Sequence, residues 1–190
     1  MATNYGGGGQ AEFFDRMGVT KQNTITFGIN SAMVSNCGGK WLGIGGGNGA
    51  SDVFHILEPT GIDTYSIRQE HLPFGPRTRA RNSAVCVDDQ YVYYHGGMDA
   101  AKVYHNDLWR YDTVTGAWLE MSSGGLAAHY PTMTYDPTIN ALMTYGGTVD
   151  GAVANNLWLY FIDQDRWVDL AEWAKAKGVS MVNLGRAVYV

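Results

Sequence analysis

The side chains best suited to catalysis or metal binding in this sequence are five histidines, and their spacing matches no common site. They are His55, His71, His95, His105 and His129. No two of them stand four residues apart, the spacing that places two imidazoles on one helix face around a metal ion. The sequence also lacks a G-x-S-x-G motif for a nucleophilic serine. We therefore predict a protein that is not an enzyme and that uses no metal or cofactor.

Three double glycines are the next candidates, because glycine-rich loops can bind phosphate. They are Gly45-Gly46, Gly96-Gly97 and Gly146-Gly147. A phosphate-binding loop joins a strand to a helix, whereas each of these pairs ends a predicted strand. We interpret them as positions that need an unusual backbone conformation or close packing between neighbouring units.

The double glycine is part of a repeat with a period of about fifty residues. Its landmarks are Gly96-Gly97, Trp109 and Trp118 in one copy, and Gly146-Gly147, Trp158 and Trp167 in the next. The glycine pair recurs after 50 residues and each tryptophan after 49. A fainter copy upstream has Gly45-Gly46, with Phe54 in the place of the first tryptophan. Such self-similarity indicates an array of small structural units.

The order of these landmarks, with the run Asn-Asp-Leu-Trp-Arg-Tyr-Asp at residues 106–112, resembles the kelch repeat. The resemblance extends over roughly residues 28 to 190. It implies that each copy is one four-stranded blade of a β-propeller, in which the blades pack side by side. It also implies protein binding as the usual role, since only a minority of kelch propellers are enzymes.

We predict an all-β, kelch-type β-propeller with about three full four-stranded blades and a partial fourth. The expected divisions are a glycine-rich N-terminal arm with possible closing strands (1–27), three blades (28–80, 81–128 and 129–178) and the start of another blade (179–190). A short helix should interrupt the strands after residue 169. Asp169 and Glu172 have the spacing of a capping box, and Gly178 stands where a helix would stop.

A propeller closes when every blade packs against two neighbours, and three and a half blades leave two faces uncovered. Three solutions remain open. The chain is a segment of a longer protein, several copies complete one ring as a homo-oligomer, or N-terminal strands near Phe13 and Thr24–Phe27 pair with the C-terminal strands to form a fourth blade.

The composition of the chain limits the kinds of partner and the cellular locations that we expect. The net charge is −5 with no basic stripe, which argues against nucleic-acid binding. The sequence shows no signal-peptide pattern and no apolar run long enough for a membrane span. Cys37 and Cys86 are expected to be buried, reduced thiols, although a disulfide between neighbouring inner strands is geometrically possible. We predict a cytoplasmic location, or one within an intracellular or viral assembly.

The resemblance also places a binding face, because kelch partners often dock where the loops entering each inner strand converge. The matching positions are Asn30, Arg79, Arg81, His129 and Tyr130, with Arg77 beside them. Arginine forms strong bidentate pairs with carboxylates, so this loop could bind an acidic peptide. A simple solvated basic loop is the other interpretation.

The favoured function is a non-catalytic protein–protein interaction or scaffold module within a larger assembly, with other protein subunits as partners. The alternative is a propeller that binds carbohydrate or another small ligand at its central mouth. That alternative requires exposed aromatic side chains, whereas we expect the four tryptophans of the repeat to lie in the core between blades.

Overall fold

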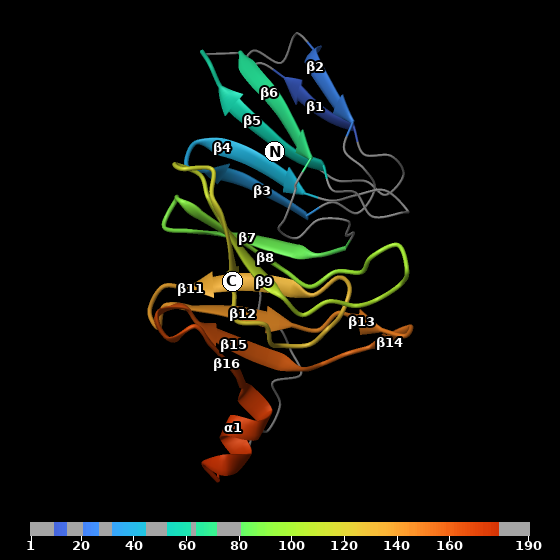
Figure 1. Ribbon diagram of the computed structural model, residues 1–190, viewed down its shortest axis with the longest axis vertical. Coiled ribbons are helices and arrows are strands. Elements are labelled where there is room, and N and C mark those ends of the chain that lie inside the picture. Colours follow the sequence, from blue (N-terminus) through green and yellow to red (C-terminus); the bar gives the residue numbers. More distant parts are fainter. Residues whose placement is uncertain are drawn as a thin grey trace.

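The computed structural model describes residues 10–14, 21–26, 32–44, 53–61, 64–71 and 81–178. Within these residues the chain forms three four-stranded antiparallel sheets, which we call blades 1, 2 and 3 (Figure 1). Blade 1 contains β3 (Ala32–Cys37), β4 (Lys40–Ile44), β5 (Val53–Pro59) and β6 (Tyr65–His71). Blade 2 contains β7 (Ser83–Val87), β8 (Tyr91–His95), β9 (Leu108–Asp112) and β10 (Trp118–Met121). Blade 3 contains β11 (Thr132–Asp136), β12 (Ala141–Tyr145), β15 (Leu157–Phe161) and β16 (Arg166–Asp169).

The three blades are stacked in chain order, with blade 2 in the middle. The first strand of each blade packs beside the first strand of the next, so that β7 contacts both β3 and β11. Figure 1 shows the blades as successive layers. This arrangement confirms the predicted all-β fold of four-stranded propeller blades.

The sequence of β8 reflects its position in the middle blade. Neighbouring residues of a strand point to opposite faces, and Tyr93 and Tyr94 are both at most 1% exposed. Tyr94 packs towards blade 1 and Tyr93 packs towards blade 3. Because both faces of β8 are covered, its sequence lacks the alternation of polar and apolar residues that marks a strand with one wet face.

Two aromatic cores join the blades. The core between blades 1 and 2 contains Phe54, Tyr94 and Tyr111, with Trp118 packed against them. The core between blades 2 and 3 contains Tyr93, Leu142 and Tyr160, with Trp167 packed against them. The second tryptophan of each repeat is partly buried and packs against an inter-blade core, as predicted. Trp109 and Trp158 are half-buried and are not part of these two clusters.

The double glycines of blades 2 and 3 provide conformation and space, as predicted. Gly97 has φ 95° and Gly147 has φ 100°, a region that side chains disfavour. A Cβ on Gly147 would lie 2.9 Å from the carbonyl oxygen of His129. Glycine at this position lets the end of β12 approach the chain that enters β11. The first pair, Gly45-Gly46, lies outside the described residues.

The expectation of two reduced thiols is wrong, because Cys37 and Cys86 form a disulfide. The two cysteines are separated by 49 residues, about one repeat, and each lies near the end of the first strand of its blade. Packing of β3 against β7 brings their Cα atoms to 5.7 Å, within the range that a disulfide spans. The bond therefore links blade 1 covalently to blade 2.

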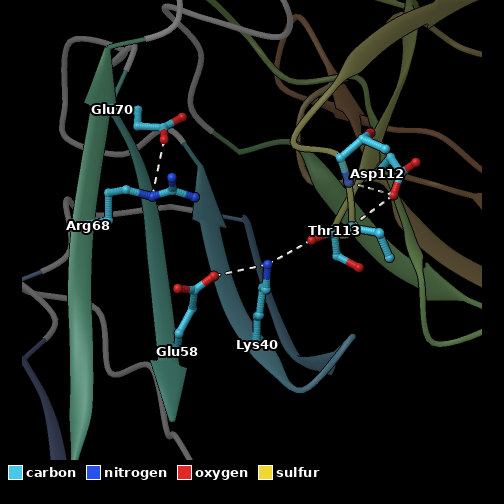
Figure 2. Close-up of polar contacts among 8 residues, drawn as sticks. Lys40, Glu58, Arg68, Glu70, Asp112 and Thr113 are labelled. Carbon is cyan, nitrogen blue, oxygen red and sulfur yellow. Dashed lines mark hydrogen bonds and ion pairs between the residues drawn. The ribbon is translucent and has the colours of Figure 1, made fainter. Parts of the chain in front are cut away.

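Polar contacts near the disulfide also link these two blades. Lys40 Nζ donates a hydrogen bond to the carbonyl oxygen of Thr113 in blade 2 over 2.7 Å, and it lies 2.9 Å from Oε1 of Glu58 in its own blade (Figure 2). The hydrogen bond from Lys40 lowers the pKa of Glu58. Gly38 N donates to Asp89 Oδ1 over 2.9 Å. Blade 1 is thus attached to blade 2 by covalent, apolar and polar contacts.

The predicted helix is present as α1 (Leu170–Ala176). The Asp169 side chain accepts hydrogen bonds from the backbone N–H groups of Ala171 and Glu172, which satisfies two N–H groups that lack intrahelical partners. Gly178 follows the helix with φ 66°. The N-cap and the stop signal were therefore read correctly from the sequence.

Two short hairpins complete the described elements. The strands β1 (Gln10–Phe14) and β2 (Lys21–Thr26) pair with each other, and β13 (Thr148–Val149) pairs with β14 (Ala152–Val153). A 3-10 turn, Ile162–Gln164, precedes β16. The predicted partial blade 179–190 and the glycine-rich residues 1–9 lie outside the described residues. No helix in the described part of the chain is long and apolar enough to cross a membrane.

Asp165 is a polar link between blades 2 and 3, and its removal should destabilise the protein. Its carboxylate accepts hydrogen bonds from Ser122 N, Ser122 Oγ and the buried hydroxyl of Tyr160. We expect Asp165→Ala to lower the free energy of unfolding by about 1–3 kcal/mol, because the Tyr160 hydroxyl loses its acceptor. Urea unfolding at pH 7 measures this loss.

The same contacts predict how the effect depends on pH. The hydrogen bonds from Tyr160 and Ser122 lower the pKa of Asp165, so its stabilising contribution is present above the unfolded-state pKa of about 3.9. It is lost as the pH falls through the lower folded-state pKa. The difference between wild type and Asp165→Ala should therefore shrink under strongly acidic conditions. Asp163→Ala is the matched control, because within the described residues the Asp163 carboxylate has a hydrogen bond from Asn140 only. An equal loss in both variants would contradict the assignment.

Candidate protein-binding face

One end of blades 2 and 3 gathers the residues directly before β7 and β11, the β8–β9 loop and the β13–β14 hairpin. Figure 1 shows the β8–β9 loop and this hairpin projecting on the same side of the molecule. We call this end the loop face and define it by the residues Arg81, Lys102, Val103, Tyr104, His129, Tyr130 and 150–153. The hairpin turns between β7 and β8 and between β9 and β10 lie at the other end of these blades.

The centre of the loop face is a cluster of Arg81, His129 and Tyr130. Arg81 Nη1 lies 3.1 Å from His129 Nδ1, and the guanidinium carbon lies 5.2 Å from the centroid of the Tyr130 ring. The rings of His129 and Tyr130 are 5.0 Å apart. Tyr130 N donates to the carbonyl oxygen of Arg81 over 2.7 Å. These contacts hold the guanidinium over an aromatic ring that is half exposed.

The protonation state of His129 follows from this geometry. Arginine can only donate hydrogen bonds, so Nδ1 of His129 accepts and the ring proton lies on Nε2. Burial, and then the charge of Arg81, lower the pKa of His129. The ring is therefore neutral near pH 7, and Arg81 carries the positive charge of the cluster.

Arg81 and Tyr130 share an uncommon backbone conformation. Their φ angles are 65° and 56°, in the left-handed region that bulky residues seldom occupy. The two residues are separated by 49 positions, so they are equivalent in successive repeats. The conformation is thus a repeated feature of the chain that enters an inner strand, and it turns both side chains onto the loop face.

Tyr104 connects the cluster to the neighbouring loops. Its ring lies 5.4 Å from that of His129, and its hydroxyl accepts a hydrogen bond from Asp150 N at the tip of the β13–β14 hairpin. Within the β8–β9 loop, Asp99 accepts from Val103 N and lies 3.2 Å from Nε2 of His105. The loop face is therefore a connected surface.

The cations of the loop face have no carboxylate partner within the part of the chain that the structure describes. Neither Arg81 nor Lys102 forms an ion pair there. The exposed carboxylate of the face is Asp150, at the tip of the hairpin. Arg81, next to an aromatic ring and without an acidic partner, is suited to bind a carboxylate from another molecule.

Three of the six predicted binding residues come together in this cluster, namely Arg81, His129 and Tyr130. The other three, Asn30, Arg77 and Arg79, lie outside the described residues. The sequence reasoning missed Tyr104, Val103 and Val153. A signal existed for the two valines, because each stands between the double glycine and the next tryptophan of its repeat.

The described residues contain no group of three histidine, cysteine, aspartate or glutamate side chains arranged to hold a metal ion. The cluster at the centre of the loop face, together with Tyr104, supplies one cation, one neutral imidazole and two phenols. Such a set can bind an anionic or aromatic group.

Comparison with known proteins supports the repeat assignment. Residues 79–125, which include all of blade 2, match the model of the kelch motif. The chain is also 26% identical over 128 residues to the alpha chain of flagellar outer arm dynein from Chlamydomonas reinhardtii. That match covers 64% of this chain but 3% of the dynein chain. Residues 79–125 thus carry a kelch motif, and the stacked four-stranded blades are consistent with part of a kelch-like β-propeller.

Proposed function

We propose that the chain is a non-catalytic protein-interaction module of a larger assembly, and that it binds its partner at the loop face. The observation that carries this proposal is the Arg81 guanidinium, which lies against the half-exposed ring of Tyr130 with no carboxylate partner in the described residues. An arginine beside an aromatic ring is a common anchor of protein interfaces.

The similarity of the chain to known proteins supports a binding role. Kelch repeats are in general protein-interaction modules. The dynein relative is, by its name, a component of the flagellar outer arm. By analogy, the partners of this chain are other protein subunits, and additional subunits could also cover blade faces. A second copy of the chain is one candidate for that cover.

Replacing Arg81 by glutamate is expected to weaken binding of the natural partner at least tenfold. The change removes a charge-assisted hydrogen bond and places a like charge opposite the partner carboxylate, and a charged hydrogen bond contributes about 1.5–3 kcal/mol. The full chain first captures candidate proteins from extract. Each candidate is then purified and titrated by calorimetry against the wild type and Arg81→Glu.

Arg166→Glu is the matched control for this experiment. Arg166 also lies over an aromatic ring, 5.6 Å from that of Phe161, but it is on the outer strand β16 of blade 3. Thermal melts first establish that both variants are folded. Unchanged affinity in Arg81→Glu, or an equal loss in Arg166→Glu, would sink the proposal that the loop face is the docking site.

Binding of a carbohydrate is the second candidate, favoured by the exposed face of the Tyr130 ring, since sugars stack on such rings. Trp118 and Trp167 pack against the inter-blade cores and are only partly exposed, which makes them poor candidates for a sugar platform. A glycan array probed with the wild type separates the two functions. The carbohydrate function would be favoured if the wild type bound specific glycans, Tyr130→Ala did not, and no protein partner were found.

A further inference from the structure

Two valines stand out on the loop face because they are apolar, exposed and carried by corresponding segments of blades 2 and 3. Val103 in the β8–β9 loop is 52% exposed, and Val153 in β14 is 86% exposed. Each lies in the segment that joins the second and third long strands of its blade, where strand pairing makes Val103 the counterpart of Ala152 and Val153 the counterpart of Tyr104. The turn that presents Val103 is fixed by its own hydrogen bond, from Val103 N to Asp99 Oδ1 over 2.9 Å. Neither side chain contributes to a described core.

Isolated exposed apolar residues are normal on proteins, and this chain has others. Val114 is 76% and Ile139 is 46% exposed, in turns at the opposite end of the blades. Val103 and Val153 differ from these residues because contacts connect them to the Arg81 cluster. Val103 adjoins Tyr104, whose hydroxyl bonds to the hairpin that carries Val153 and whose ring contacts His129 in the Arg81 cluster.

The positive charges near these valines indicate which side chains the partner should carry. Lys102 precedes Val103, has φ 65° and is exposed, and Arg81 lies at the centre of the same face. Both cations lack an ion pair within the described part of the chain. A surface that combines two cations with exposed valines complements acidic residues that are flanked by apolar side chains.

We infer that the partner of the loop face is a protein segment in which a carboxylate side chain is flanked by apolar residues. The carboxylate pairs with Arg81, and the apolar residues cover Val103 and Val153. This inference rests on the proposed function, because it specifies the chemistry of the partner that docks at the same face. Neither valine side chain belongs to a core cluster of the described residues, so packing within the chain does not explain it.

A displayed library of random twelve-residue peptides, selected on the full wild-type chain, tests this inference. We expect enriched peptides to contain Asp or Glu with Leu, Ile, Val or Phe nearby. Binding of the best synthetic peptide should weaken at least tenfold in the double variant Val103→Ser/Val153→Ser, and it should weaken with added salt because the ion pair is near the surface. The matched control Val114→Ser/Ile139→Ser should bind as the wild type does.

Three results would overturn the inference. They are failure to enrich any peptide, enrichment of peptides without acidic residues, and full binding by Val103→Ser/Val153→Ser. The two proposals fail separately. If Arg81→Glu weakens the natural partner while the valine variant does not, the docking face stands and the partner chemistry is wrong. If neither variant affects the natural partner, the docking face itself is wrong. Urea unfolding shows whether each variant retains its fold.

Discussion

Replacing both Cys37 and Cys86 by alanine should lower the free energy of unfolding by about 2–4 kcal/mol. The disulfide closes a loop of 49 residues, so it removes many conformations from the unfolded chain. It also holds blade 1 against blade 2 at the inner strands. The stability of a domain of this size is typically only about 5–15 kcal/mol, so the loss is a large fraction. Urea unfolding of wild type and Cys37→Ala/Cys86→Ala measures it.

The wild-type protein in dithiothreitol is the control, since reduction opens the disulfide without changing a side chain in the core. Reduced wild type and the double variant should unfold at similar urea concentrations, apart from the small cavity left at the fully buried Cys37. An unchanged midpoint on reduction, with two thiols titrated, would show that the bond contributes nothing to stability.

The disulfide also bears on where the protein resides. Structural disulfides form and persist mainly in oxidising environments. Our prediction of a cytoplasmic location, or of an intracellular or viral assembly, stays a prediction, and the bond between Cys37 and Cys86 weighs against a strongly reducing compartment. Mass spectrometry of protein from its native source, alkylated before reduction, would measure the oxidised fraction directly.

The regular part of the fold was predictable from the sequence because it follows from a repeat. The period of 49–50 residues located matching strands, and the glycine pairs marked their ends. Local signals were sufficient for the helix as well, since Asp169 and Gly178 are the cap and the stop of α1. Such features depend on near neighbours in the chain, so no knowledge of the tertiary structure was needed.

The features that the sequence did not reveal depend on contacts between repeats. The disulfide became evident only when β3 and β7 were seen side by side, although the spacing of Cys37 and Cys86 by one repeat was a usable clue. Tyr104 was missed because its link to the hairpin runs to the backbone N–H of Asp150, which carries no signature in the sequence. The candidate site combines predicted residues with residues that long loops bring beside them.

Phe54→Ala should lower the free energy of unfolding by about 3–5 kcal/mol, the largest loss we expect from a single substitution. The Phe54 side chain is fully buried. Its ring lies 4.9 Å from that of Tyr111, 5.3 Å from that of Trp118 and 6.4 Å from that of Tyr94, all edge-on. These three rings belong to blade 2, so the substitution opens a cavity between blades. Urea unfolding followed by tryptophan fluorescence measures the loss.

Two comparisons test whether this loss arises at the contact between blades. Val153→Ala changes an exposed apolar residue and should alter stability by less than about 0.5 kcal/mol. The loss of unfolding free energy caused by Phe54→Ala should differ between the wild type and the Cys37→Ala/Cys86→Ala variant. The disulfide and the aromatic core both hold blade 1 to blade 2, and contributions of neighbouring sites are not additive. Strict additivity would mean that the disulfide and the aromatic core act independently.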